Sequence, residues 1–169
     1  MPRVDFTTLP DDARVWVFGA DRALSDDERA RLLAVVDAYL DRWAAHGAPL
    51  KSGREWRDER FLAIGVDQST AGASGCSIDA LFRQLQAVER ELGASLVGGG
   101  RVFWRTTAGE VRSADHGEFA ERAGRGEITP TTPVFDPTVQ SLGDFRRRFE
   151  RPASDSWHST LLPASSRGS

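Results

Sequence analysis

The feature that most constrains the fold is an uninterrupted apolar run, FLAIGV, at residues 61–66. A run of this length between polar segments is typical of a central strand that is covered on both faces. A second run, Val15–Phe18, is rich in β-forming residues and predicts another buried strand. We therefore expect a β-sheet at the centre of the fold.

Two amphipathic helices are predicted beside these strands. The segment Ser25–Glu28 has the spacing of a capping box, and apolar residues three and four apart follow it, which predicts a helix over 26–46. A second apolar stripe with the same period predicts a helix over 77–92, which ends at Gly93. Both stripes require an apolar surface to pack on, and the sheet provides it.

The remaining segments predict short elements, and together they define a fold class. We expect a polar loop over 48–59, a hairpin of strands 102–104 and 110–112, a helix over 117–124, an edge strand over 132–135 and a last helix over 141–151. This order indicates an α+β fold: a two-layer sandwich of a small mixed sheet with the two main helices on one face. A ferredoxin-like split βαβ arrangement with C-terminal additions is the first topology to consider.

Length and cysteine usage favour a single soluble domain. At 169 residues the chain fits one α+β domain over 1–162, and the Ser- and Gly-rich end, 163–169, is expected to be disordered. The chain has one cysteine and can form no internal disulfide, which favours a reducing, cytoplasmic setting. The first residues have no signal-peptide pattern, and no apolar run approaches the ~20 residues that span a membrane.

The charge of the chain excludes some partners. A formal net charge of −3 gives no basic field for nucleic acid or for an anionic membrane. The arginine cluster 146–148 could grip an acidic partner, but on an amphipathic helix it is more often a solvated face. Lys51 is the only lysine, so any chemistry that needs an ammonium group depends on it.

The strongest candidate site follows the central strand. Asp67 ends this strand, and the loop QSTAGASG (68–75) leads to a helix that is expected to start at Cys76 or Ser77. Small side chains let the backbone N–H groups of such a loop approach a ligand, and a helix start adds unpaired donors and a positive dipole end. These features suit a small anionic group such as a carboxylate or phosphate. The ligand-binding residues expected are Asp67, Ser74, Gly75, Cys76, Ser77 and Asp79.

The same segment is also compatible with a purely structural role or with catalysis. Ser74, Cys76 or Ser77 would serve equally well as a helix cap, with Asp79 in the first turn. A thiol enzyme is an alternative, with Cys76 as nucleophile, His46 or His158 as base and Asp79 or Asp67 orienting the base. His46 has a structural role open to it too, because the predicted helix 26–46 would end there. A third class is a structural or assembly module that works through Trp56, the arginine cluster and the tail.

Several common chemistries lack their motifs. A Walker A loop needs G-x-x-x-x-G-K-[ST] after a strand, whereas Gly47–Ser52 has Leu50 in place of the second glycine and follows a helix, which argues against an ATPase. No HxxxH or CxxC occurs, so no metal site is expected, and no motif calls for a cofactor.

In five segments the chain resembles a family of small uncharacterised bacterial proteins whose members often carry the label "ABC transporter ATPase". The segments are RVWVFGADRALSDDE, WAAHGAPL, FLAIGVDQSTAGASGCSID, TPVFDPTVQSL and SWHSTLL, and the likeness runs over nearly the whole chain in this order. The resemblance draws attention to the residues Trp43, His46, Asp67, Gly75, Cys76, Asp79, Trp157 and His158. The hypothesis is thus a cytoplasmic protein that binds a small anionic ligand or a protein partner at 67–79.

Overall fold

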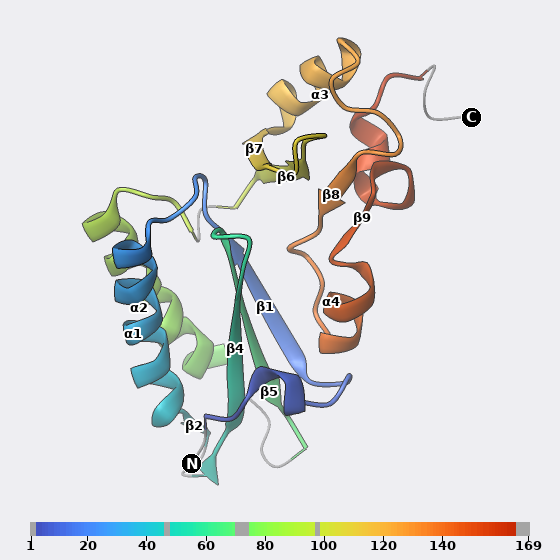
Figure 1. Ribbon diagram of the computed structural model, residues 1–169. Coiled ribbons are helices and arrows are strands. Elements are labelled where there is room, and N and C mark those ends of the chain that lie inside the picture. Colours follow the sequence, from blue (N-terminus) through green and yellow to red (C-terminus); the bar gives the residue numbers. More distant parts are fainter. Residues whose placement is uncertain (1–2, 46–47, 70–74, 97–98, 165–169) are drawn as a thin grey trace. The chain divides into compact units, whose positions relative to one another are not determined.

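The computed structural model describes residues 3–45, 48–69, 75–96 and 99–164 (Figure 1). The chain forms two compact units. The first consists of residues 1–97 with 137–146, and the second of residues 98–136 with 147–169. Each unit contains an antiparallel sheet and helices, so the α+β class expected from the sequence is confirmed.

The first unit is built on a three-stranded sheet of order β1-β5-β4, in which both pairings are antiparallel. Its elements in chain order are η1 (Phe6–Thr8), β1 (Arg14–Gly19), α1 (Asp26–Asp41), β2 (Ala44–Ala45), β3 (Ala48–Pro49), β4 (Lys51–Arg57), β5 (Phe61–Asp67) and α2 (Gly75–Leu92). Every residue of β5 is buried, as its apolar sequence predicts. Residues 137–146 complete the unit with the first part of α4 (Leu142–Arg148).

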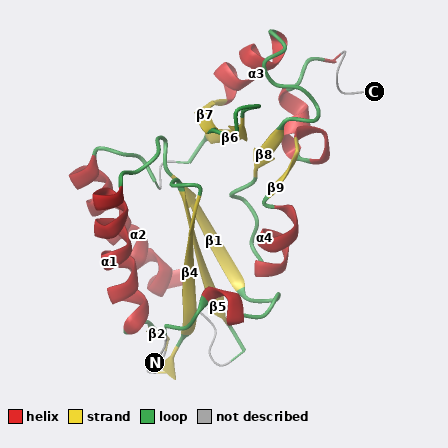
Figure 2. Ribbon diagram, in the orientation of Figure 1, coloured by secondary structure: helices red, strands yellow, loops and turns green. Residues whose placement is uncertain are grey.

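The two main helices cover one face of this sheet, as expected (Figure 2). Leu62, Ile64 and Val66 of β5 point to that face and join one apolar core with residues of α1 and α2. The helices run antiparallel to each other, because Arg31 in the first half of α1 pairs with Glu91 at the end of α2 at 2.9 Å. The start of α2 therefore lies toward the end of α1.

The opposite face of the sheet is covered by the N-terminal arm, residues 3–9. Gly53 of β4 and Gly65 of β5 are cross-strand partners, and they leave room for the arm. A Cβ on Gly65 would lie 2.9 Å from Leu9, and a Cβ on Gly53 would lie 2.7 Å from the carbonyl oxygen of Val4. The Phe6 ring sits edge-on to Phe145 at a centroid distance of 5.8 Å.

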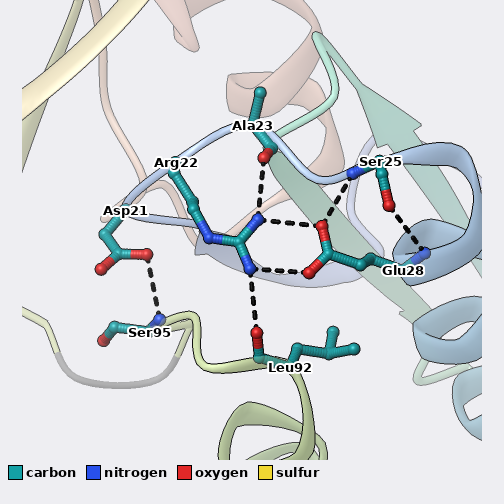
Figure 3. A network of polar contacts seen from close by, with 7 residues as sticks. All are labelled: Asp21, Arg22, Ala23, Ser25, Glu28, Leu92 and Ser95. Atoms are coloured by element: carbon teal, nitrogen blue, oxygen red, sulfur yellow. Dashed lines mark hydrogen bonds and ion pairs between the residues drawn. The ribbon is translucent and has the colours of Figure 1, made fainter.

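The start of α1 is fixed by the capping box that the sequence predicts (Figure 3). The N–H of Glu28 donates to Ser25 Oγ, and the N–H of Ser25 donates to a Glu28 carboxylate oxygen. Arg22 donates to both carboxylate oxygens of Glu28, at 2.9 and 2.6 Å, and to the carbonyl of Leu92 at 2.9 Å. The hydrogen bonds that the Glu28 carboxylate accepts, those from Arg22 first and the one from the Ser25 N–H second, lower the pKa of Glu28 to about 2. One arginine thus ties the start of α1 to the end of α2.

The second unit holds a four-stranded sheet of order β7-β6-β8-β9, also antiparallel. Its elements are β6 (Arg101–Arg105), β7 (Val111–Asp115), α3 (His116–Gly124), β8 (Pro133–Phe135), β9 (Glu150–Pro152), η2 (Ala153–Asp155) and η3 (Trp157–Leu161). The predicted hairpin and short helix are present as β6, β7 and α3. An apolar cluster that includes Trp104, Phe119 and Val134 forms the core.

Three details of the first unit and of the sheets differ from the sequence-based expectation. The pairing of the named strands is antiparallel rather than mixed, and it lacks the parallel pair of a split βαβ unit. The helix predicted over 26–46 ends at Asp41, where Arg42 leaves helical geometry with φ −123° and ψ 9°. The segment predicted as a loop over 48–59 contains β4, a polar strand with the sequence KSGREWR.

The last two segments were also predicted imperfectly. The strand expected at an edge, β8, lies between β6 and β9, and its one proline, Pro133, is tolerated because it is the first residue of the strand. The helix expected over 141–151 covers Leu142–Arg148 and gives way to β9. Within the described ranges, no helix is long and apolar enough to cross a membrane.

Candidate functional site

Asp67 is the best-defined residue of the candidate site. It closes β5 and is 9% exposed. Its Oδ1 accepts hydrogen bonds from the hydroxyl and the backbone N–H of Ser69, at 2.7 and 2.9 Å. These two bonds, the hydroxyl first, lower the pKa of Asp67, so its carboxylate is charged at neutral pH. The hydrogen bonds of this carboxylate therefore fix the turn after the strand.

Lys51 lies directly across from Asp67. It is the first residue of β4, its Cα partner in the ladder is Asp67, and its side chain is exposed. Its positive charge also lowers the pKa of Asp67. This pairing was not predicted from the sequence, because residues 48–59 were expected to form a loop. No local signal indicated it, because KSGREWR has no alternation of apolar and polar residues and its partner strand is identified only by the fold.

The helix that follows the candidate loop starts at Gly75, slightly earlier than predicted. Gly75, Cys76 and Ser77 are its first three residues, and the side chains of Cys76 and Ser77 lie outside the described part of the structure. Asp79 is exposed and is the fifth helical residue, so the expectation of an acidic residue in the first turn was wrong. Ser74 lies outside the described residues.

The ends of several helices and strands meet at one end of the first unit. The end of α1 leads through Trp43 to β2 and β3, and Leu50 bonds back to the carbonyl of Trp43 at 2.9 Å before β4 begins. The start of β4 pairs with the end of β5, and α2 begins beside the end of α1. Sequence positions 43, 51, 67 and 75 therefore share one end of the unit.

His46, for which a helix-capping or a catalytic role was expected, lies outside the described residues. The helix that was predicted to reach position 46 ends at Asp41. The strands on either side of position 46, β2 and β3, pair with each other. Trp43 is part of the core, with ring centroids 5.5 Å from Tyr39 and 6.1 Å from Trp16.

His158 belongs to the second unit, where the structure gives it a packing role. It is fully buried, its Nδ1 lies 2.7 Å from Ser156 Oγ, and its ring stacks on Trp157 at 3.8 Å. Burial lowers its pKa to about 4. Trp157 donates to Asp136 at 3.2 Å. The segment SWH is thus part of the folded second unit.

The arginine cluster and Trp56, which were proposed to serve an assembly module, also make contacts within the fold. Arg146 pairs with Asp11 at 2.6 Å and donates to the carbonyl of Leu9 at 2.9 Å. Trp56 is half-buried and packs against the core of the first unit. In the described ranges, no group of three or more histidine, cysteine, aspartate or glutamate side chains could hold a metal ion.

Comparison of the chain with models of protein families, with curated proteins and with solved structures gave no match. What the protein does must therefore be inferred from its own residues.

Proposed function

We propose that this protein binds a small anionic ligand, a carboxylate or a phosphate, at the strand–loop–helix segment 67–79. The observation that carries the proposal is the pairing of Lys51 with Asp67 at the end of the unit where α2 begins. The first N–H groups of a helix have no partner within the helix, and its dipole favours a negative charge. Lys51 adds a mobile ammonium group at the same end.

Asp67 has a shaping role in this proposal. Its carboxylate is engaged by Ser69 and repels an anion, so the ligand would meet Lys51 and the helix start rather than Asp67. The proposal includes the other expected ligand-binding residues, Ser74, Gly75, Cys76, Ser77 and Asp79. It also includes a cytoplasmic location, which the single cysteine favours.

Inorganic phosphate is the probe for the first test. We expect phosphate, added at constant ionic strength, to shift the amide NMR signals of residues 67–79 in a saturable way. Lys51→Ala should weaken this binding about tenfold, because a hydrogen bond to a charged group is lost, whereas Lys51→Arg should retain it. Equal binding by the wild type and Lys51→Ala, or shifts reproduced by chloride alone, would contradict the proposal.

A thiol-dependent enzyme is the second candidate, and the position of Cys76 as the second residue of α2 favours it. A thiol at a helix start ionises more readily than a free one. This candidate predicts that iodoacetamide alkylates Cys76 in the folded protein at pH 6 at least about tenfold faster than in the urea-unfolded chain. A thiol that reacts only after unfolding removes the enzyme candidate, while phosphate binding by Cys76→Ser would leave the binding proposal intact.

A further inference from the structure

A pocket of about 330 Å³ lies in the first unit, between the N-terminal arm, α1 and β4. The arm contributes Arg3, Val4, Asp5 and Phe6, α1 contributes its last residue, Asp41, and β4 contributes Arg54. This volume is at the low end of the range for small-molecule sites. The lining thus combines two arginines, two aspartates and two apolar residues.

The charged groups are held in place by one another. Asp37 of α1 accepts two hydrogen bonds from Arg54, at 2.8 and 2.9 Å, and pairs with Arg3 at 3.3 Å. Arg3 Nε donates to Asp41 Oδ1 at 2.7 Å. The bonds from Arg54 above all lower the pKa of Asp37, so it is charged at neutral pH. The network positions the groups of the pocket before any ligand arrives.

The network nevertheless leaves some carboxylate acceptors and some guanidinium donors without a hydrogen bond among the described residues. Among the described residues, Asp41 uses only Oδ1, and Asp5 uses only Oδ1, which accepts from Thr7. Each of the two guanidinium groups has one terminal nitrogen, Nη2 of Arg3 and Nη1 of Arg54, with no partner there. A pocket with spare carboxylate acceptors and spare guanidinium donors is complementary to a ligand that carries both an ammonium and a carboxylate.

We propose that this pocket binds a free α-amino acid, with its ammonium group on Asp5 and Asp41 and its carboxylate on Arg3 and Arg54. Val4 and Phe6 are the two apolar residues of the lining, and an aliphatic side chain would lie against them. A ligand with one charge leaves half of the spare groups unpaired, and desolvating unpaired groups costs affinity. The site is separate from the proposed function at 67–79, and either proposal can fail alone.

The test compares L-leucine with two analogues that each lack one charge, using calorimetry and the amide NMR signals of residues 3–6, 41 and 54. We expect L-leucine to bind at least about tenfold more tightly than N-acetyl-L-leucine or L-leucinamide. Equal affinity for the three compounds, or no saturable shift with L-leucine up to about 10 mM, would overturn the proposal.

Variants assign the two halves of the ligand. Asp41→Asn should weaken binding of L-leucine about tenfold and leave N-acetyl-L-leucine unchanged, because that analogue has no ammonium group. Arg3→Gln should weaken L-leucine about tenfold and leave L-leucinamide unchanged. Arg31→Gln, which removes an exposed guanidinium paired with Glu91 on α2, is the matched control and should bind like the wild type. A loss of binding in the control, or none in Asp41→Asn and Arg3→Gln, rules out this site.

Discussion

Replacing Gly53 with valine should destabilise the protein by about 3 kcal/mol, as overpacking of a filled interior does. The Cβ of any residue at position 53 would lie 2.7 Å from the carbonyl oxygen of Val4 and 3.0 Å from the backbone of Phe6. Backbone atoms cannot swing away like the end of a side chain, so the N-terminal arm must leave β4. Urea unfolding measures the loss, and the amide signals of residues 3–9 report whether the arm has moved.

Gly124→Ala is the matched control for this prediction. Gly124 is the last residue of α3, and nothing lies within 4 Å of the Cβ it would gain. Alanine in a helix is more favourable than glycine by up to about 1 kcal/mol, so this variant should be as stable as the wild type or slightly more so. If Gly53→Val does not fold, Gly53→Ala provides a milder test. A stability of Gly53→Ala equal to that of the wild type would contradict the contact with the arm.

Acidification should cost the second unit about 3 kcal/mol between pH 6.5 and pH 4 through His158 alone. Burial lowers the pKa of His158 from 6.5 to about 4. The unfolded chain takes up this proton near pH 6.5, whereas the folded chain resists it until about pH 4. The contribution of His158 to stability is therefore complete above pH 6.5 and is lost as the pH falls to 4.

The groups around His158 do not offset this effect. Asp136 favours the charged imidazole, whereas Arg151 and His116 oppose it, and burial outweighs them all. The measurement is the free energy of unfolding as a function of pH for the wild type and for His158→Phe. The titration of the carboxylates is common to both proteins, so it cancels when one curve is subtracted from the other. NMR of the imidazole ring gives a local reading. A His158 ring that titrates near pH 6.5 would contradict the prediction.

The elements with a strong apolar period were predictable from the sequence. The run at 61–66 became a fully buried strand, and the stripe over 77–92 became α2 with its end unchanged. The capping box at Ser25 also formed as expected, because it depends only on residues within one turn. Local chemistry decided these features, and local chemistry is what a sequence displays directly.

The features missed from the sequence depend on distant partners. β4 is polar because its edge faces the arm and its side chains make ion pairs, such as Arg54 with Asp37. No local pattern shows that Gly53 and Gly65 are opposite each other or that Lys51 faces Asp67. Beyond the early end of α1, Trp43 packs on Trp16, a residue far away in sequence. Of the proposed site, the end of the strand at Asp67 and the helix that follows were predicted from the sequence, whereas the position of Lys51 opposite Asp67 was not.

Both edges of the three-stranded sheet bond to other segments of the chain, one near residue 4 and one near residue 140. On β4 the N–H of Val4 donates to the carbonyl of Ser52, and on β1 Val15 and Ala13 bond with Gln140 and Leu142. An open strand edge invites pairing with a neighbouring molecule. During synthesis the β1 edge has no partner until residue 142 has left the ribosome. In the complete fold this edge is covered by a segment that is synthesised about 120 residues after β1.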